Sequence, residues 1–325
     1  MTTHHRSLAI SIAVCCLTSI LAGVAWAQTY PTKPVRVLIA TSAGSNPDTI
    51  MRIVANGFTQ VWHQQVIVDN RAGAGGNIGA ELAARAPADG YTLFLAHTNH
   101  SINATLYRKL SYDIVKDFLP VSLLALSPFV AAVHPSVPVK SLRELINLAK
   151  ARPGDLTYAS AGAGSGTFFA AEYFNGMANA KMLHVPYKGG GPALTAAVAG
   201  ETAVYFTPIG PGLPHIQSGK LRALGVSAPK RLAQLPAVPP IAETLPGYEM
   251  LSWAGLMVPA GTPQSIIESV HKTAVSVLNT PEVSKRLGAM GYIVVGGGPE
   301  DLAAYVKTEI AKYSRIIRQI GLPPQ

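Results

Sequence analysis

The feature that most constrains the fold of this chain is an apolar run that ends in a glycine-containing polar loop and continues as a helix. Val35–Ala40 is the apolar run, and its length and branched residues predict a buried parallel strand. The loop Thr41–Asn46 follows, and apolar residues at helical spacing then extend to Phe58. A helix that begins at such a loop presents free backbone N–H groups at the positive end of its dipole. The unit is therefore either an ordinary strand–helix turn or an anion-binding site.

Two residues at the start of this helix bear on that choice. Ser45 and Asp48 have the spacing of a capping box, and Pro47 lies in the first turn, where its missing N–H costs nothing. Asp48 either caps its own helix or contacts a ligand that also carries an amine, because a carboxylate repels an anion. The loop contains no Arg or Lys, so recognition there would use backbone amides, serine and water.

The N-terminal residues predict a signal peptide over residues 1–27. Arg6 precedes an apolar segment, and Ala25-Trp26-Ala27 supplies the small residues that a signal peptidase requires. The segment is too short for a membrane anchor, so we expect export and cleavage near Ala27. Cys15 and Cys16 both lie within it, so the mature chain would have neither disulfides nor cysteine ligands for a metal.

The charge balance favours an anionic partner. The chain has 26 Lys and Arg against 17 Asp and Glu, and only Arg6 lies in the predicted signal peptide. A basic surface attracts anions. No Lys/Arg run or basic–aromatic stripe is present, so nucleic acid is not an expected partner.

The strand–loop–helix unit occurs again near the middle of the chain. Leu156–Ser160 predicts a strand, and the glycine-rich loop 161–167 leads into the helix Phe168–Met177. Tyr91–Ala96 predicts another strand, which ends in the polar cluster His97–Ser101, a usual position for ligand contacts in open α/β sheets. Ala72–Ala86 resembles a dinucleotide fingerprint only loosely, since Ile78 occupies the third glycine position.

Catalytic motifs are absent from the sequence. It has no GxSxG elbow, no HExxH pair and no metal-ligand spacing, so no metal or cofactor is expected. An exported α/β hydrolase without a recognisable motif remains the alternative class.

Two long apolar segments predict how the chain is divided. Val121–Val133, interrupted at Ser127-Pro128, and Met250–Val258 are expected to cross between two lobes. The C-terminal helices would then complete the N-terminal lobe. We therefore predict a first lobe of residues 28–126 plus 254–325, a second lobe of residues 127–253, and a cleft between them.

Several stretches resemble one family, the Bug-type periplasmic solute-binding proteins of tripartite tricarboxylate transporters. They occur in the order that the family shows and span almost the whole mature chain: Ala43–Arg52, Asp69–Ala80, Asp89–Leu93, Tyr112–Val121, His184–Ala193, Gly219–Leu224 and Trp253–Pro263. Two departures, the tract Leu235–Pro240 and the segment Gly200–Val204, affect the expected ligand contacts rather than the family.

The resemblance implies an α/β, two-lobed periplasmic-binding-protein fold that closes on a small organic carboxylate and delivers it to transporter membrane subunits. It implies a soluble periplasmic receptor, which we expect to be a monomer, and not an enzyme. Lys188 is either a ligand cation or solvated, and Phe168 and Phe169 are candidates for the pocket wall beside Tyr187. Carried onto this chain, the expected ligand-binding residues are Ser42, Ala43, Gly44, Ser45, Asp48, Thr98, Asn99, Ser160, Ala161, Gly164, Ser165, Thr167, Tyr187, Lys188 and Gly189.

Overall fold

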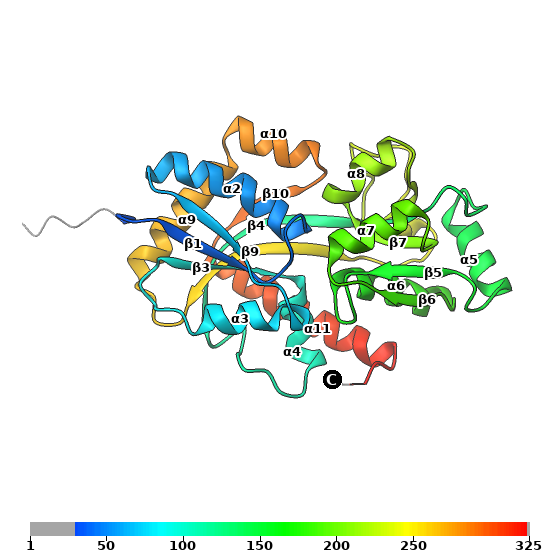
Figure 1. Ribbon diagram of the computed structural model, residues 1–325, viewed down its shortest axis with the longest axis horizontal. Helices are drawn as coiled ribbons and strands as arrows, with labels where there is room; N and C mark the ends of the chain where they lie inside the picture. The colour runs from blue at the N-terminus through cyan, green and yellow to red at the C-terminus, as the bar shows by residue number, and fades with distance from the viewer. Residues whose placement is uncertain (1–29, 324–325) are drawn as a thin grey trace, which may run out of the picture. The chain divides into compact units, whose positions relative to one another are not determined.

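The computed structural model describes residues 30–323, and every element named below lies in the compact unit that begins at Lys33 (Figure 1). The expected signal peptide and its cleavage site lie outside the described residues.

The first sheet contains the apolar run Val35–Ala40, which forms its strand β1 (Val35–Ile39). Its strand order is β2-β1-β3-β9-β4, and β10 pairs with the other side of β4. β1 pairs in parallel with both β2 and β3, which confirms the predicted buried parallel strand. The bounds are Val35–Ile39 (β1), Val66–Asn70 (β2), Thr92–His97 (β3), Phe118–Val133 (β4), Leu251–Pro259 (β9) and Ile293–Gly297 (β10).

The second sheet has the order β8-β4-β7-β5-β6 and shares β4 with the first. Its other strands are Thr157–Ser160 (β5), Leu183–Pro186 (β6), Val204–Pro208 (β7) and Arg222–Val226 (β8). β4 pairs with β9 up to Pro128 and with β7 and β8 from Phe129 onward. The predicted crossing segment is therefore one continuous strand that changes sheets at the predicted interruption.

The chain returns from the second sheet to the first beside the point at which β4 changes sheets. β9 begins at Leu251, which pairs with Pro128, and the preceding Met250 N donates to Ser227 O beside β8. β9 pairs with β3 and β4 of the first sheet, so the chain returns to that sheet just before Leu251 rather than along the expected segment.

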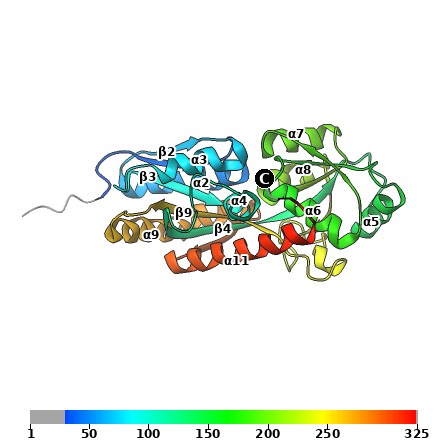
Figure 2. The same ribbon diagram turned by 90° about the horizontal axis from the view of Figure 1, so that it is seen from below.

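Helices cover both faces of the first sheet (Figures 1 and 2). On one side lie Asn46–Trp62 (α2), Gln264–Leu278 (α9) and Pro281–Ala289 (α10). On the other lie Ala74–Gly76 (η1), Asn77–Ala84 (α3), Thr98–Leu106 (α4) and Pro299–Gln319 (α11). The second sheet carries Leu142–Ala151 (α5), Gly166–Ala178 (α6), Gly190–Ala199 (α7) and Ile209–Gln217 (α8), and Ile241–Glu243 (η2) precedes β9.

The C-terminal helix α11 packs against the cores of both sheets (Figure 2). Leu302 and Val306 lie in the apolar cluster beneath the first sheet, together with Phe94. Farther along the helix, Tyr313 and Ile316 lie in the larger cluster of the second sheet. The helix thus connects the two cores on the side where α4 and α6 also approach each other.

One helix was absent from the sequence prediction. The cluster after β3 was expected to be a polar loop, but α4 begins at Thr98 directly after the strand. His97 and His100 cap this start reciprocally: the His97 side chain accepts from Asn99 N, and the His100 side chain accepts from His97 N. Histidine is not among the usual capping residues, so the helix start was not recognisable.

Candidate functional site

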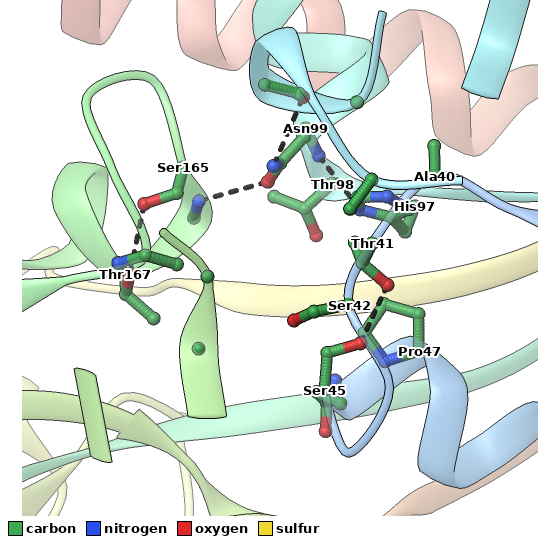
Figure 3. A pocket seen from close by; sticks show the side chains of 18 of the residues that line it. Ala40, Thr41, Ser42, Ser45, Pro47, His97, Thr98, Asn99, Ser165 and Thr167 are labelled. Carbon is green, nitrogen blue, oxygen red and sulfur yellow. Dashed lines mark hydrogen bonds between the residues drawn. The ribbon is translucent and has the colours of Figure 1, made fainter. Parts of the chain in front are cut away.

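A cavity of about 530 Å³ lies where the loops of the two sheets face each other. Helix starts surround it: α2 and α4 from the first sheet, and α6 and α7 from the second. Figure 3 shows Ser165 and Thr167 on one side, Thr41, Ser42 and Ser45 on the other, and Asn99 between them.

Most of the predicted site residues line this cavity. They are Ser42, Ser45, Thr98, Asn99, Ala161, Ser165, Thr167, Tyr187, Lys188 and Gly189. Ala43, Gly44, Asp48, Ser160 and Gly164 lie outside its wall.

The first loop is stabilised from within by Asp48. The Asp48 side chain is only 2% exposed and accepts hydrogen bonds from Gly44 N at 2.8 Å, Arg52 Nε at 3.0 Å and Asn70 Nδ2 at 3.0 Å. The expected capping box is wrong in detail, because the Ser45 hydroxyl bonds to Thr41 Oγ1 at 2.7 Å rather than to its own helix. The Asp48 carboxylate instead accepts from Gly44 N, one residue before Ser45 N, which a capping box would use.

Two serines on the crossing strands hold the starts of α2 and α4. Ser127 on β4 and Ser252 on β9 are paired residues of neighbouring strands. Ser127 Oγ donates to Asn46 Oδ1 at 3.1 Å, and Thr98 Oγ1 donates to Ser252 Oγ at 3.1 Å. Each helix start is therefore attached to the point where the two sheets join.

Two buried histidines lie behind the start of α4. His97 lines the cavity, and its ring packs edge-on against His100 at 4.3 Å between centroids. Burial, reinforced by the neighbouring His100, holds the pKa of His97 well below its usual range, and burial lowers the pKa of His100 to about 4. Both rings are therefore neutral at physiological pH, as hydrogen-bond partners rather than cations.

The loop before α6 repeats this design in the second sheet. Ser165 caps α6 by accepting from Phe168 N at 3.2 Å, and Thr167 Oγ1 accepts from Ala161 N at 2.9 Å. Ser160 lies behind the loop, where its hydroxyl contacts His184 Nε2 at 2.6 Å and accepts from Gly162 N at 3.0 Å. Ser160 thus supports the loop without reaching the cavity.

One hydrogen bond and two close approaches join elements of the first sheet to elements of the second. Gly166 N donates to Asn99 Oδ1 at 3.2 Å. A Cβ at Gly189 would lie 2.7 Å from Ser42 Oγ, and one at Gly164 would lie 2.8 Å from a Leu106 methyl carbon. Gly164 is therefore a packing position between the two sides, and a side chain at Gly189 would displace the Ser42 hydroxyl.

Of the three aromatic residues expected in the pocket wall, Tyr187 lines the cavity. Phe168 and Phe169 both lie in the buried cluster of the second sheet rather than in the cavity wall. Lys188 lines the cavity and is exposed to solvent.

Sequence reasoning missed part of the wall. The turn Ala72–Gly76, together with Asn46, Phe129, Tyr205, Pro208 and Ser252, also lines the cavity. Gly73, Gly75 and Gly76 have positive φ, which glycine adopts readily, and Ala74 between them also has a positive φ of 47°. The glycine-rich stretch was visible in the sequence, but no local signal placed it at the cavity.

Two sheets that share a strand and enclose a cavity lined by helix starts define the two-lobed class of periplasmic binding proteins. The family model described as the tripartite tricarboxylate transporter family receptor matches residues 50–322. This chain therefore belongs to that family of receptors, and the hydrolase alternative has no support. Each helix within residues 30–323 is too short or too polar to span a lipid bilayer.

Individual relatives are similar in sequence to this chain over nearly its whole length. Protein BugT of Bordetella pertussis is 32% identical over 319 residues, covering 97% of this chain and 98% of BugT. The structure of R. palustris Rpa4515 with adipate is 33% identical with a TM-score of 0.88, covering 91% of this chain and 100% of that one. MatC (Rpa3494) from Rhodopseudomonas palustris with bound malate is 30% identical with a TM-score of 0.84, covering 89% and 100%.

Proposed function

We propose that this protein is an exported receptor that binds a small organic carboxylate in the cavity and delivers it to the membrane subunits of a transporter. The observation that carries the proposal is the arrangement of the cavity wall. The N-termini of α2, α4 and α6 contribute to one cavity, and none of the described residues that line it is Asp or Glu. Helix N-termini and uncharged donors stabilise a carboxylate through hydrogen bonds and partial positive charge.

The relatives with bound ligands suggest which acids to test first. Adipate and malate, which the two related structures contain, are both dicarboxylates. In the present cavity the start of α2 and the exposed Lys188 belong to different sheets. A ligand with an acid group at each end could use both, so small dicarboxylates are the first candidates.

The proposal also assigns roles to individual residues and divides the chain into two lobes. The predicted residues that line the cavity are proposed to bind the ligand, whereas Asp48, Ser160 and Gly164 are proposed to support the loops. Residues 28–126 with 254–325 form the proposed first lobe and residues 127–253 the second. Asn99 at α4 and Gly166 at α6 would then be joined only when the cleft is closed. We further propose that the mature protein is a periplasmic monomer.

A thermal-shift screen tests the function. Residues 28–325 would be unfolded in urea and refolded to remove any co-purified ligand, then heated with mono-, di-, tri- and aromatic carboxylates. A ligand that binds only the folded state stabilises it by about 2.7 kcal/mol at a hundredfold excess over Kd. The diamides of the same acids are matched controls, because they keep the size and lose the charge.

We expect a shift with one class of acid and none with its diamide. Equal shifts with acid and diamide, or no shift with any acid after refolding, would contradict carboxylate recognition.

A further inference from the structure

Asn46 lies in the cavity wall with half of its side chain unpartnered. It is the first residue of α2 and is 5% exposed. Its Oδ1 accepts from the buried Ser127 Oγ at 3.1 Å, which directs the amide. Its Nδ2 is buried and has no hydrogen-bond partner among residues 30–323. Buried N–H groups are nearly always paired, so an acceptor from a ligand or from ligand-bound water is expected beside it.

Two other polar atoms in the same wall are also buried and unpartnered. They are His97 Nε2 and Ser42 Oγ. His97 Nδ1 accepts from Asn99 N at 3.4 Å, so the proton of the neutral ring lies on Nε2. The His97 ring and the Asn46 amide therefore both offer N–H donors, and the Ser42 hydroxyl can donate as well.

The described residues of the cavity wall provide no carboxylate that could pair with a ligand ammonium group. None of the described residues that line it is acidic, and the carboxylate nearest in sequence, Asp48, is already committed to Gly44 N, Arg52 and Asn70. Lys188 is the basic side chain of the wall. A ligand ammonium group would lose water in this cavity without gaining an anionic partner, and it would face N–H donors of like polarity.

We propose that this receptor selects carboxylates without an ammonium group, and that Asn46, oriented by Ser127, is a principal residue in that selection. The inference rests on the proposed function, because it concerns the same cavity and excludes amino acids from its ligands.

The test compares ligands that differ only by an amine. Suitable pairs are succinate and aspartate, glutarate and glutamate, adipate and 2-aminoadipate, and 3-phenylpropionate and phenylalanine. Kd values would be measured by titration calorimetry on the refolded chain, and any other acid found in the thermal-shift screen would be paired with its α-amino form. For the tightest-binding acid we expect at least tenfold weaker binding of its amino counterpart, about the effect of one charge-assisted hydrogen bond.

Substitutions at Asn46 identify the residue responsible. Asn46→Asp keeps the shape and replaces the N–H donors by a carboxylate. It should raise the Kd of the acid by at least about tenfold and reduce the ratio between the Kd values of the amino acid and the acid. Asn46→Ala removes the donors without adding charge and should also weaken the acid. Asn56→Asp makes the same change at an exposed position of α2 outside the cavity and should leave both Kd values unchanged.

The outcomes separate the inference from the proposed function. If the wild type binds an acid and its amino counterpart equally, the receptor function stands and this inference is wrong. Asn46→Asp and Asn46→Ala proteins that are folded by circular dichroism and bind the acid as the wild type does would exclude Asn46 from the selection. If no carboxylate binds to the refolded wild type, the proposed function fails, and the inference fails with it.

Discussion

Replacement of Asp48 by Asn should destabilise the protein because this carboxylate stabilises the first loop. The side chain is 2% exposed and accepts from a backbone N–H, an arginine and an asparagine amide. Asn has the same shape but only one acceptor oxygen. At least one donor therefore loses its partner and meets an N–H₂ group instead.

The size of the effect follows from these contacts. A hydrogen bond to a charged group contributes about 1.5–3 kcal/mol, and a buried donor without a partner costs about 1–3 kcal/mol. The Arg52 side chain is 52% exposed, so water can replace much of its ion pair. We expect Asp48→Asn to lower the free energy of unfolding by about 2–4 kcal/mol, which lowers Tm by roughly 4–10 °C for a chain of this size.

Urea unfolding of the refolded protein at pH 7, followed by circular dichroism, measures this change. Asp155→Asn is the matched control, because Asp155 is exposed and its carboxylate has no hydrogen bond or ion pair within the described residues. It should alter the unfolding free energy by less than about 0.5 kcal/mol. If Asp48→Asn left stability unchanged and abolished ligand binding, Asp48 would be a ligand contact and the structural interpretation would be refuted.

Three further changes test other parts of the structure. Gly79→Ala would place a Cβ 2.7 Å from a backbone oxygen and should cost about 1–3 kcal/mol or more in urea unfolding, whereas Gly191→Ala, with nothing within 4 Å, should not destabilise. The pKa of His100 falls from 6.5 in the unfolded chain to about 4 in the folded protein. The free energy of unfolding is therefore highest above pH 6.5 and should fall by up to about 3 kcal/mol as the pH drops toward 4. His100→Asn should flatten this dependence of the unfolding free energy on pH, and an unchanged dependence would contradict a neutral buried ring. Asn99→Ala removes the bond to Gly166 N and should weaken binding about 2- to 10-fold by calorimetry. The ligand-bound variant should also have a larger radius of gyration than the ligand-bound wild type by X-ray scattering; wild-type values for both would show that the bond does not hold the cleft closed.

The sequence alone determined the units from which the fold is built. Apolar runs bounded by glycine and proline predicted β1 and β5, and the interruption at Ser127-Pro128 predicted the point at which β4 changes sheets. The loops before α2 and α6 were identifiable as candidate ligand loops, because a strand that runs into a glycine-containing turn and a helix start is a local pattern.

Tertiary structure alone decided which of these parts meet. Ser127 contacts Asn46 across 81 residues, and Thr98 contacts Ser252 across 154, and no local pattern encodes pairs so far apart. The same limit applies to Asp48, whose polar partners lie both in its own loop and at Asn70, beyond the end of α2. Secondary structure follows from neighbours in sequence, whereas the donors left free in the cavity depend on which distant side chains take up the others.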